Sequence, residues 1–244
     1  MSVIQPQFMP LWPIPFGYAN IGQKYHNLNK QLVADIEAEK ESYPSEKRTF
    51  AKNDSGWQSK RFLENKYKSF DELSKIIISA AIPLLHRSGV SPDVSFVANK
   101  LWANMIFAKG GWSNPHTHGS SDTFWSGVYY PKGMDDIKNL DEFDLNDYML
   151  FGINSDVGGV LVVKDSNISK KMLKVKMNHE KYYGTNFSII PRESLLILFP
   201  AWLEHYVTPT TDNSKRYSIS FSISIVKPQM QNLIETNNVT IGRV

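Results

Sequence analysis

The sequence predicts a mainly β fold, either a sandwich or a jelly roll, preceded by two helices. From residue 94 onward the chain consists of short runs rich in β-branched and aromatic residues, separated by glycine, proline, asparagine and aspartate, which is typical of strands joined by turns. Because no helical pattern lies between these runs, we expect the strands to pair antiparallel. The length of 244 residues, of which 41% are hydrophobic and 12% aromatic, is sufficient for a buried core.

Two amphipathic helices are expected in the amino-terminal part of the chain. In the first, apolar residues recur at helical spacing from Leu28 onward. The second is expected to have Ser69 as its N-cap, to be kinked or ended early by Pro83, and to be closed by Gly89. The polar segment between the two helices is expected to be a loop that carries a buried Trp57.

Strands are expected in most of the rest of the chain, and the last of them has two distinct faces. Arg216 and every second residue up to Ser224 are polar, whereas the residues between them are apolar, which indicates side chains alternating between the faces of a sheet. If the apolar face packs against the helices, the polar face can line a cavity for a small ligand. The expected strands are Val94–Phe107, Thr123–Tyr130, Gly159–Val163, Met172–Met177, Phe187–Ile190, Leu195–Phe199, His205–Val207 and Arg216–Val226.

We expect one structural domain with three regions. Residues 1–92 form a helical support region, residues 93–226 form the jelly-roll core, and residues 227–244 form a tail that packs over an edge or stays mobile. Within the core, the acidic and turn-rich stretch 132–147 is expected to be an insertion of undetermined shape.

The composition excludes several kinds of site. The chain has no cysteine, so any bound metal must use nitrogen and oxygen ligands, and disulfides and cysteine nucleophiles are excluded. The net charge of +3 comes from 27 basic and 24 acidic residues spread along the chain, which argues against nucleic-acid binding. We expect no secretion signal, because Met1–Tyr18 lack a basic start and an uninterrupted apolar stretch, and no apolar run approaches the roughly 20 residues that span a bilayer. We therefore expect a soluble, cytoplasmic protein whose oligomeric state is open, a homodimer included.

Three histidines are the strongest candidates for metal binding. His116 and His118 are two residues apart, and in an extended segment this spacing places both imidazoles on one face within chelating distance. His205, at the start of a later expected strand, is the third candidate. Such sets match non-haem iron sites, and imidazole also suits copper, nickel and zinc. Many of these sites replace one imidazole with a carboxylate; the nearest acid is Asp122, and we favour the three-histidine set.

Arg216 and Ser218 are candidates for binding a carboxylate. The planar guanidinium group of arginine binds a carboxylate through two parallel hydrogen bonds, in a way that lysine cannot reproduce. Ser218 lies two residues further along, on the same expected face, where its hydroxyl can add a donor to the same group. The alternative for Arg216 is a salt bridge with a surface acid at a strand end, which is the commoner role of an arginine.

The order of several motifs resembles that of the iron(II)- and 2-oxoglutarate-dependent oxygenases. The resemblance extends from about Trp57 to Val226. It is closest to a subgroup common in marine bacteria and their tailed phages, and it is distantly similar to the prolyl 4-hydroxylases. The motifs are Asp54–Ser59, Trp102–Asn104, Asn114–His118, Trp125–Tyr130, Gly158–Leu161, Phe199–His205 and Arg216–Phe221.

This resemblance implies a double-stranded β-helix, a cupin-like jelly roll, with the amino-terminal helices packed on one sheet. It also implies a dioxygenase that uses iron(II), O2 and 2-oxoglutarate to hydroxylate a substrate with release of succinate and CO2; the substrate itself is not indicated. The residues implied to hold the iron are His116, His118 and His205, although position 118 is Asp or Glu in the usual pattern. Those implied to bind 2-oxoglutarate are Arg216 and Ser218 at its distal carboxylate, with Asn104, Ser126 and Tyr130 lining the pocket.

Two other functions stay open at this point. The first is a three-histidine, cupin-type metal enzyme without 2-oxoglutarate, against which Arg216 and Ser218 argue, because such a site needs no group to bind a distal carboxylate. The second is a non-catalytic jelly roll that serves as a structural or interaction module. For a phage-encoded chain the expected location is the host cytoplasm. Trp112, Trp125 and Trp202 are expected either to wall a dry pocket or to pack in the core.

Overall fold

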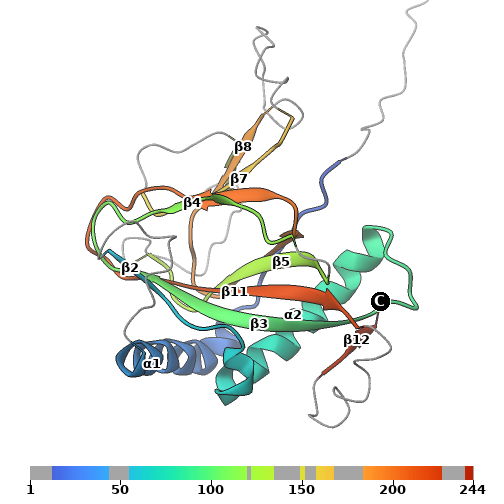
Figure 1. Ribbon diagram of the computed structural model, residues 1–244, viewed down its shortest axis with the longest axis horizontal. Helices are drawn as coiled ribbons and strands as arrows, with labels where there is room; N and C mark the ends of the chain where they lie inside the picture. Colours follow the sequence, from blue (N-terminus) through green and yellow to red (C-terminus); the bar gives the residue numbers. More distant parts are fainter. Residues whose placement is uncertain are drawn as a thin grey trace, which may run out of the picture.

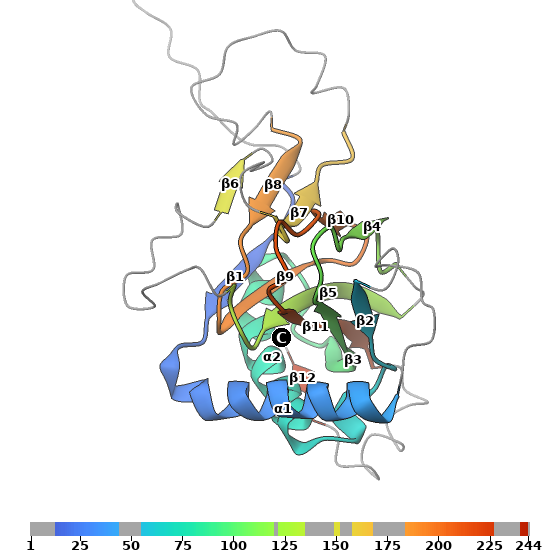
Figure 2. The same cartoon turned by 90° about the vertical axis from the view of Figure 1, so that its left-hand side faces the viewer.

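Two antiparallel β-sheets face each other, and two helices cover the outer side of the larger sheet (Figure 1, Figure 2). The computed structural model describes residues 13–43, 55–119, 122–134, 149–151, 158–167, 184–226 and 240–243. The expected strand Met172–Met177 and most of the stretches 132–147 and 227–244 lie outside these residues. In the part of the chain that is described, no helix has both the length and the apolar character needed to cross a membrane.

The larger sheet lies between the two helices and the smaller sheet. Its strand order is β1-β9-β5-β11-β3-β12, with β2 also paired to β3, and all of these pairings are antiparallel. The strands are β1 (Gly17–Asn20), β2 (Gly56–Gln58), β3 (Ser95–Ile106), β5 (Thr123–Tyr130), β9 (Leu195–Pro200), β11 (Arg216–Ile225) and β12 (Gly242–Arg243).

The smaller sheet lies over the other side of the larger one. Its strand order is β4-β10-β7-β8-β6, again with antiparallel pairing throughout. The strands are β4 (Ser113–His116), β6 (Met149–Phe151), β7 (Leu161–Lys164), β8 (Asn186–Ile189) and β10 (Glu204–Val207). The mainly β, antiparallel fold with flanking helices that the sequence predicts is therefore confirmed.

Helices α1 (His26–Ser42) and α2 (Lys68–Arg87) pack on the outer face of the larger sheet, and the short 3-10 helices η1 (Gln23–Tyr25) and η2 (Leu63–Asn65) lead into them (Figure 1). Apolar helix residues and one face of the sheet share a buried cluster, the helix-side core, and such burial is the main stabilising term in folding. The helix-side core includes Leu32, Ile36, Leu73, Ile77, Ala81 and Leu85 from the helices and Met105, Trp125, Tyr129, Tyr217, Ile219, Phe221 and Ile223 from the sheet.

The start of α2 differs from the sequence prediction. Ser69 is not the N-cap, because the helix already begins at Lys68 and the capping position is taken by Tyr67, which makes no side-chain capping bond. The hydroxyl of Ser69 instead donates a hydrogen bond to the carboxylate of Asp35 on α1. Because the Ser69 hydroxyl is bonded to Asp35 on the neighbouring helix, it does not cap the start of α2.

The end of α2 agrees with the prediction at Gly89, and the helix does not end early at Pro83; a kink at Pro83 stays a prediction. Gly89 has a φ of 86° and its N–H donates to the carbonyl of His86, which closes the helix as a glycine is expected to do. Pro83 lies inside the helix, which continues to Arg87. The missing N–H of an internal proline costs about 3 kcal/mol. Burial of the residues on either side of Pro83 in the helix-side core offsets this cost.

The two faces of β11 are those that the alternation predicts. The apolar residues of β11 belong to the helix-side core, whereas Arg216 and Ser218 are buried on the opposite face, toward the smaller sheet. Between the two sheets lies a second buried cluster, the inter-sheet core. It consists of Val128, Tyr130, Leu161, Val163, Ile189, Leu195, Ile197, Phe199 and Leu203.

Segments outside the expected jelly-roll boundaries also join the larger sheet. β1 pairs with β9, and β2 pairs with β3 and carries the buried Trp57, whose indole N–H donates to the carbonyl of Tyr43. The tail returns as β12 at the edge of the sheet beside β3. These strands are two to four residues long. The division at residues 92 and 226 stays a prediction.

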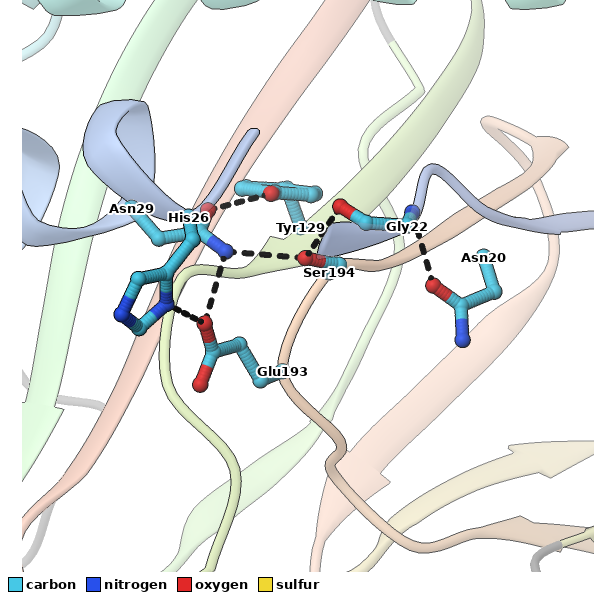
Figure 3. A network of polar contacts seen from close by, with 7 residues as sticks. All are labelled: Asn20, Gly22, His26, Asn29, Tyr129, Glu193 and Ser194. Carbon is cyan, nitrogen blue, oxygen red and sulfur yellow. Dashed lines mark hydrogen bonds and ion pairs between the residues drawn. The ribbon is translucent and has the colours of Figure 1, made fainter. Parts of the chain in front are cut away.

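A buried polar network joins α1 to the larger sheet (Figure 3). The side-chain amide of Asn29 donates to the hydroxyl of Ser194 at 2.8 Å and to the carboxylate of Glu193 at 3.1 Å, and it accepts a hydrogen bond from the hydroxyl of Tyr129. The same Glu193 oxygen lies 3.0 Å from Nδ1 of His26. Because Asn29 is 2% exposed, removal of its side chain would break hydrogen bonds that are buried from water.

We expect Asn29→Ala to lower the free energy of unfolding by about 2–4 kcal/mol, since it removes three hydrogen bonds from a network that includes the buried Tyr129 and Ser194. Chemical denaturation measures this change. Asn27→Ala, at an exposed position of the same helix, is the matched control and should change the free energy of unfolding by less than about 0.5 kcal/mol. Equal effects of the two substitutions would contradict a stabilising role for the network.

Candidate functional site

His116, His118 and His205 come together at one edge of the smaller sheet. β4 ends at His116 and lies beside β10, where His116 faces His205 across the pair. His118 follows β4, and its N–H donates to the carbonyl of Ala201 at 2.8 Å, which fixes the path of the loop. One nitrogen of each imidazole lies within 4.8 Å of the others. The structure thus brings the three histidines expected from the sequence into one cluster.

Backbone carbonyls orient two of the three rings. Nδ1 of His116 lies 2.7 Å from the carbonyl oxygen of Asn114, and Nδ1 of His205 lies 2.9 Å from that of Leu203. A carbonyl only accepts hydrogen bonds, so Nδ1 carries the proton in both rings and Nε2 keeps its lone pair. Nε2 of His205 therefore has a free lone pair on the side of the cluster, where Nε2 of His118 lies 3.0 Å away.

Burial keeps the three imidazoles uncharged. It lowers the pKa of His118 to about 2, helped by the positive charges that His205, His116 and Arg61 would place nearby. Burial, followed by the proximity of His116, lowers the pKa of His205 to about 3. The pKa of His116 is also lowered by burial, against the effect of its bond to the carbonyl of Asn114. Neutral imidazole is the form that binds a metal.

Three imidazole nitrogens suit a divalent transition-metal ion by their chemistry, and one pair of them already has the spacing of metal ligands. Two imidazole nitrogens at right angles around a metal, each about 2.1 Å from it, would be about 3.0 Å apart. The Nε2 atoms of His118 and His205 are 3.0 Å apart. Three protein ligands leave further coordination positions open for other molecules, which a catalytic metal site requires. Among the described residues, Asp122 is not part of this cluster.

Arg216 lies at the start of β11 with its guanidinium group buried. Its Nε donates to the carbonyl of Gly159 at 2.9 Å, and its two terminal nitrogens donate to the hydroxyls of Ser218 and Tyr130, each at 3.1 Å. The group also lies 5.2 Å from the centroid of the Tyr130 ring. Arg216 is only 5% exposed, and within the described part of the chain no carboxylate is in ion-pair distance of it. A buried cation without a protein anion is a favourable place for an anionic ligand.

The other expected pocket residues have different surroundings. Asn104 faces Ser218 across the β3–β11 pair, and its amide donates to the hydroxyl of Ser220 at 3.1 Å on the polar face of β11. The hydroxyl of Ser126 donates to the backbone carbonyl of Phe221 on the neighbouring strand at 2.7 Å. Its donor is therefore used within the sheet.

Trp125 packs in the helix-side core, which is one of the two roles expected for it, whereas Trp202 is 55% exposed and does not pack in the core. Two other aromatic rings lie beside the histidines. The ring centroid of Trp102 lies 5.3 Å from that of His118. The ring centroid of Phe199 lies 4.7 Å from that of His205. Sequence alternation could have found Trp102, because it lies two residues before Asn104 on the same strand and therefore on the same face.

Comparison with known proteins gives a match at the level of the sequence family. The sequence profile of a family described as "Putative 2OG-Fe(II) oxygenase" matches residues 100–222. This stretch contains the three clustered histidines as well as Arg216 and Ser218. No curated protein sequence matches the chain.

Solved structures with a similar fold include two prolyl hydroxylases and an epimerase. A prolyl-4-hydroxylase from Pseudomonas putida is 12% identical with a TM-score of 0.53, and 88% of this chain and 94% of that one are covered. A viral collagen prolyl hydroxylase from Paramecium Bursaria Chlorella virus-1, solved with 2-oxoglutarate, is 11% identical with a TM-score of 0.52 and coverage of 87% and 97%. The non-haem, α-ketoglutarate-dependent epimerase SnoN of nogalamycin biosynthesis is 8% identical with a TM-score of 0.55 and coverage of 86% and 76%.

At these identities the structural likeness concerns the fold alone, and it shows the jelly roll that the sequence predicts. The profile match spans about half of the chain and includes the histidine cluster. The chain therefore belongs to the 2OG-Fe(II) oxygenase family, whose enzymes depend on iron(II) and 2-oxoglutarate.

Proposed function

We propose that this oxygenase is a dioxygenase that hydroxylates a C–H bond of a primary substrate and converts 2-oxoglutarate into succinate and CO2. The observation that supports this most directly is the buried Arg216, which has no carboxylate partner among the described residues and lies on the face of the larger sheet that is directed toward the smaller sheet, which carries His116 and His205. A ligand that bridges these two features would need a carboxylate at one end and metal-binding oxygens at the other. 2-Oxoglutarate has both.

In this proposal His116, His118 and His205 hold the metal through their Nε2 atoms. The carbonyls of Asn114 and Leu203 orient two of these rings and leave their Nε2 lone pairs free. The set contributes no negative charge, in contrast to a site with two histidines and one carboxylate. A metal ion bound by it keeps its full positive charge, which favours the binding of a dianionic co-substrate.

Arg216 and Ser218 bind the distal carboxylate of 2-oxoglutarate. The terminal nitrogens of Arg216 already donate to the hydroxyls of Ser218 and Tyr130, so all three groups converge on one place. The bond from Nε to the carbonyl of Gly159 prevents the guanidinium group from turning away. Asn104, on the same face of the sheet, is a further polar group of this pocket.

Bound iron(II) and 2-oxoglutarate supply the oxidation, in which O2 provides one oxygen atom to succinate and one to the hydroxylated product. The contribution of the chain is to orient the reactants and to exclude water from them. Trp102 and Phe199, packed beside His118 and His205, form apolar walls next to the histidine cluster. Phe199 is also part of the inter-sheet core, so this apolar wall continues into the space between the two sheets.

Two alternatives explain fewer of the observations. A cupin-type enzyme that uses no 2-oxoglutarate gives no reason for a buried arginine without an acid partner in the described residues. A non-catalytic module gives no reason for three imidazoles, one buried and two half-buried, that each place a nitrogen within 4.8 Å of the others. The cytoplasmic location, the marine and phage subgroup and a homodimeric state stay predictions.

Arg216→Ala is expected to weaken 2-oxoglutarate binding by about 30-fold or more while changing iron(II) affinity by less than about threefold, because it removes only the group that binds the distal carboxylate. Anaerobic titration, followed by the weak visible charge-transfer absorption of an iron-chelated keto acid, measures both affinities. Arg216→Lys should bind 2-oxoglutarate almost as weakly as Arg216→Ala, since lysine cannot make the bidentate contact. An unchanged 2-oxoglutarate affinity in Arg216→Ala, with metal still bound, would favour the cupin-type alternative.

His116→Ala and His205→Ala are each expected to weaken metal binding by about 100-fold or more, because each removes one ligand. His118→Asp should retain metal binding, since a carboxylate oxygen replaces the imidazole nitrogen. Equilibrium dialysis against iron(II) under anaerobic conditions measures these affinities. His86→Ala, at an exposed position on α2, is the matched control and should bind metal like the wild type. Unchanged metal binding in His116→Ala and His205→Ala would show that the site lies elsewhere.

A further inference from the structure

Arg61 lies beside the histidine cluster on the side of Trp102. It belongs to the Ser59–Phe62 link between β2 and η2, and its guanidinium carbon lies 5.2 Å from the centroid of the Trp102 ring. The ring of Trp102 in turn lies 5.3 Å from that of His118. Arg61 is exposed whereas Trp102 is buried, so the arginine is the solvent-facing member of this cation–π pair.

The positive charge of Arg61 is not neutralised within the described part of the chain. No carboxylate there lies within ion-pair distance of it, and its guanidinium N–H groups make no hydrogen bond to the described residues. Several lysines of the chain behave differently, because each is paired with an acid. These pairs are Lys66–Glu39, Lys75–Asp71, Lys164–Glu204 and Lys215–Glu37.

The backbone that carries Arg61 is held in a fixed position. The N–H of Ser59 donates to the carbonyl of Ala103, and the N–H of Ala103 donates to the hydroxyl of Ser59, both at 2.9 Å, next to Trp102 on β3. On the other side of Arg61, Phe62 has a φ of 70°, in the left-handed region that non-glycine residues rarely adopt. Such strained positions concentrate at binding and catalytic sites. Arg61 is therefore presented at a defined place beside Trp102.

The electrostatic balance of the proposed site favours an anion at this position. The three imidazoles bring no negative charge, so a divalent metal ion and Arg216 together carry one positive charge more than the dianion 2-oxoglutarate neutralises. Arg61 adds a further positive charge on the Trp102 side of His118. A charge at the mouth of a site raises the local concentration of oppositely charged molecules.

We propose that Arg61, supported by Trp102, binds an anionic group of the primary substrate, either a carboxylate or a phosphate, and so determines substrate specificity. This inference rests on the proposed function, because it assumes that the primary substrate enters beside the histidine cluster. Arg61 is distinct from Arg216, which is buried and already makes hydrogen bonds to Gly159, Ser218 and Tyr130. Guanidinium groups bind both carboxylates and phosphates through paired N–H donors.

The test is a titration of the full chain, loaded with redox-inert Zn(II) and 2-oxoglutarate, with inorganic phosphate and with acetate at constant ionic strength. The arginine Nε–H signals are followed by NMR, and the signal lost in Arg61→Gln identifies Arg61. We expect saturable binding of at least one of the two anions, and about tenfold or more weaker binding in Arg61→Gln. Whichever anion binds more tightly indicates whether the substrate carries a phosphate or a carboxylate.

Arg87→Gln is the matched control, because Arg87 is exposed at the end of α2; it should bind the anions like the wild type. Absent binding, or equal binding in the wild type and in Arg61→Gln, would overturn the proposal. The affinity for 2-oxoglutarate is measured on the same samples. If the wild type does not bind 2-oxoglutarate, the proposed function is contradicted. The role of Arg61 is judged only on the difference in anion affinity between the wild type and Arg61→Gln.

Discussion

The pairing of β4 with β10 is the constraint on which the candidate site depends. Hydrogen bonds between these two short strands place His116 opposite His205, although the two histidines are far apart in the sequence. The bond from the N–H of His118 to the carbonyl of Ala201 then holds the third ring against the second. Backbone bonds, rather than contacts among the rings, therefore assemble the cluster. A metal can bind such a preformed set with little reorganisation.

The two faces of the larger sheet have different roles: one packs against the helices, and the other carries residues of the proposed site. One face of β11 packs in the helix-side core, and the other presents Arg216 and Ser218 to the interior. Because side chains alternate along a strand, one rigid element both anchors the helices and fixes the proposed carboxylate-binding group. The network around Asn29 attaches α1 to Tyr129 on β5 and to Ser194, which directly precedes β9 (Figure 3). The next residue of β5, Tyr130, accepts a hydrogen bond from Arg216.

Local patterns predicted much of this arrangement. The alternation along β11 identified its polar face, and the two-residue spacing identified His116 and His118 as a pair, because both follow from the geometry of an extended chain. The prediction for Ser69 failed because a distant partner decided the outcome: this residue donates to Asp35 on another helix. Pro83 is retained in α2 by burial of its neighbours. The strands β1 and β2 are too short to show a pattern and exist because longer strands lie beside them.

The sequence by itself determined the class of fold, the absence of thiolate chemistry and the residues able to bind a metal and a carboxylate. These properties depend on residue types and on periodicity, which are local. Only the tertiary structure decided that the three histidines share one cluster, that Arg216 is buried without a described acid partner, and that Trp102 and Arg61 border the site. Such facts depend on which strands pair and in which register, and register is set by contacts between residues distant in the chain.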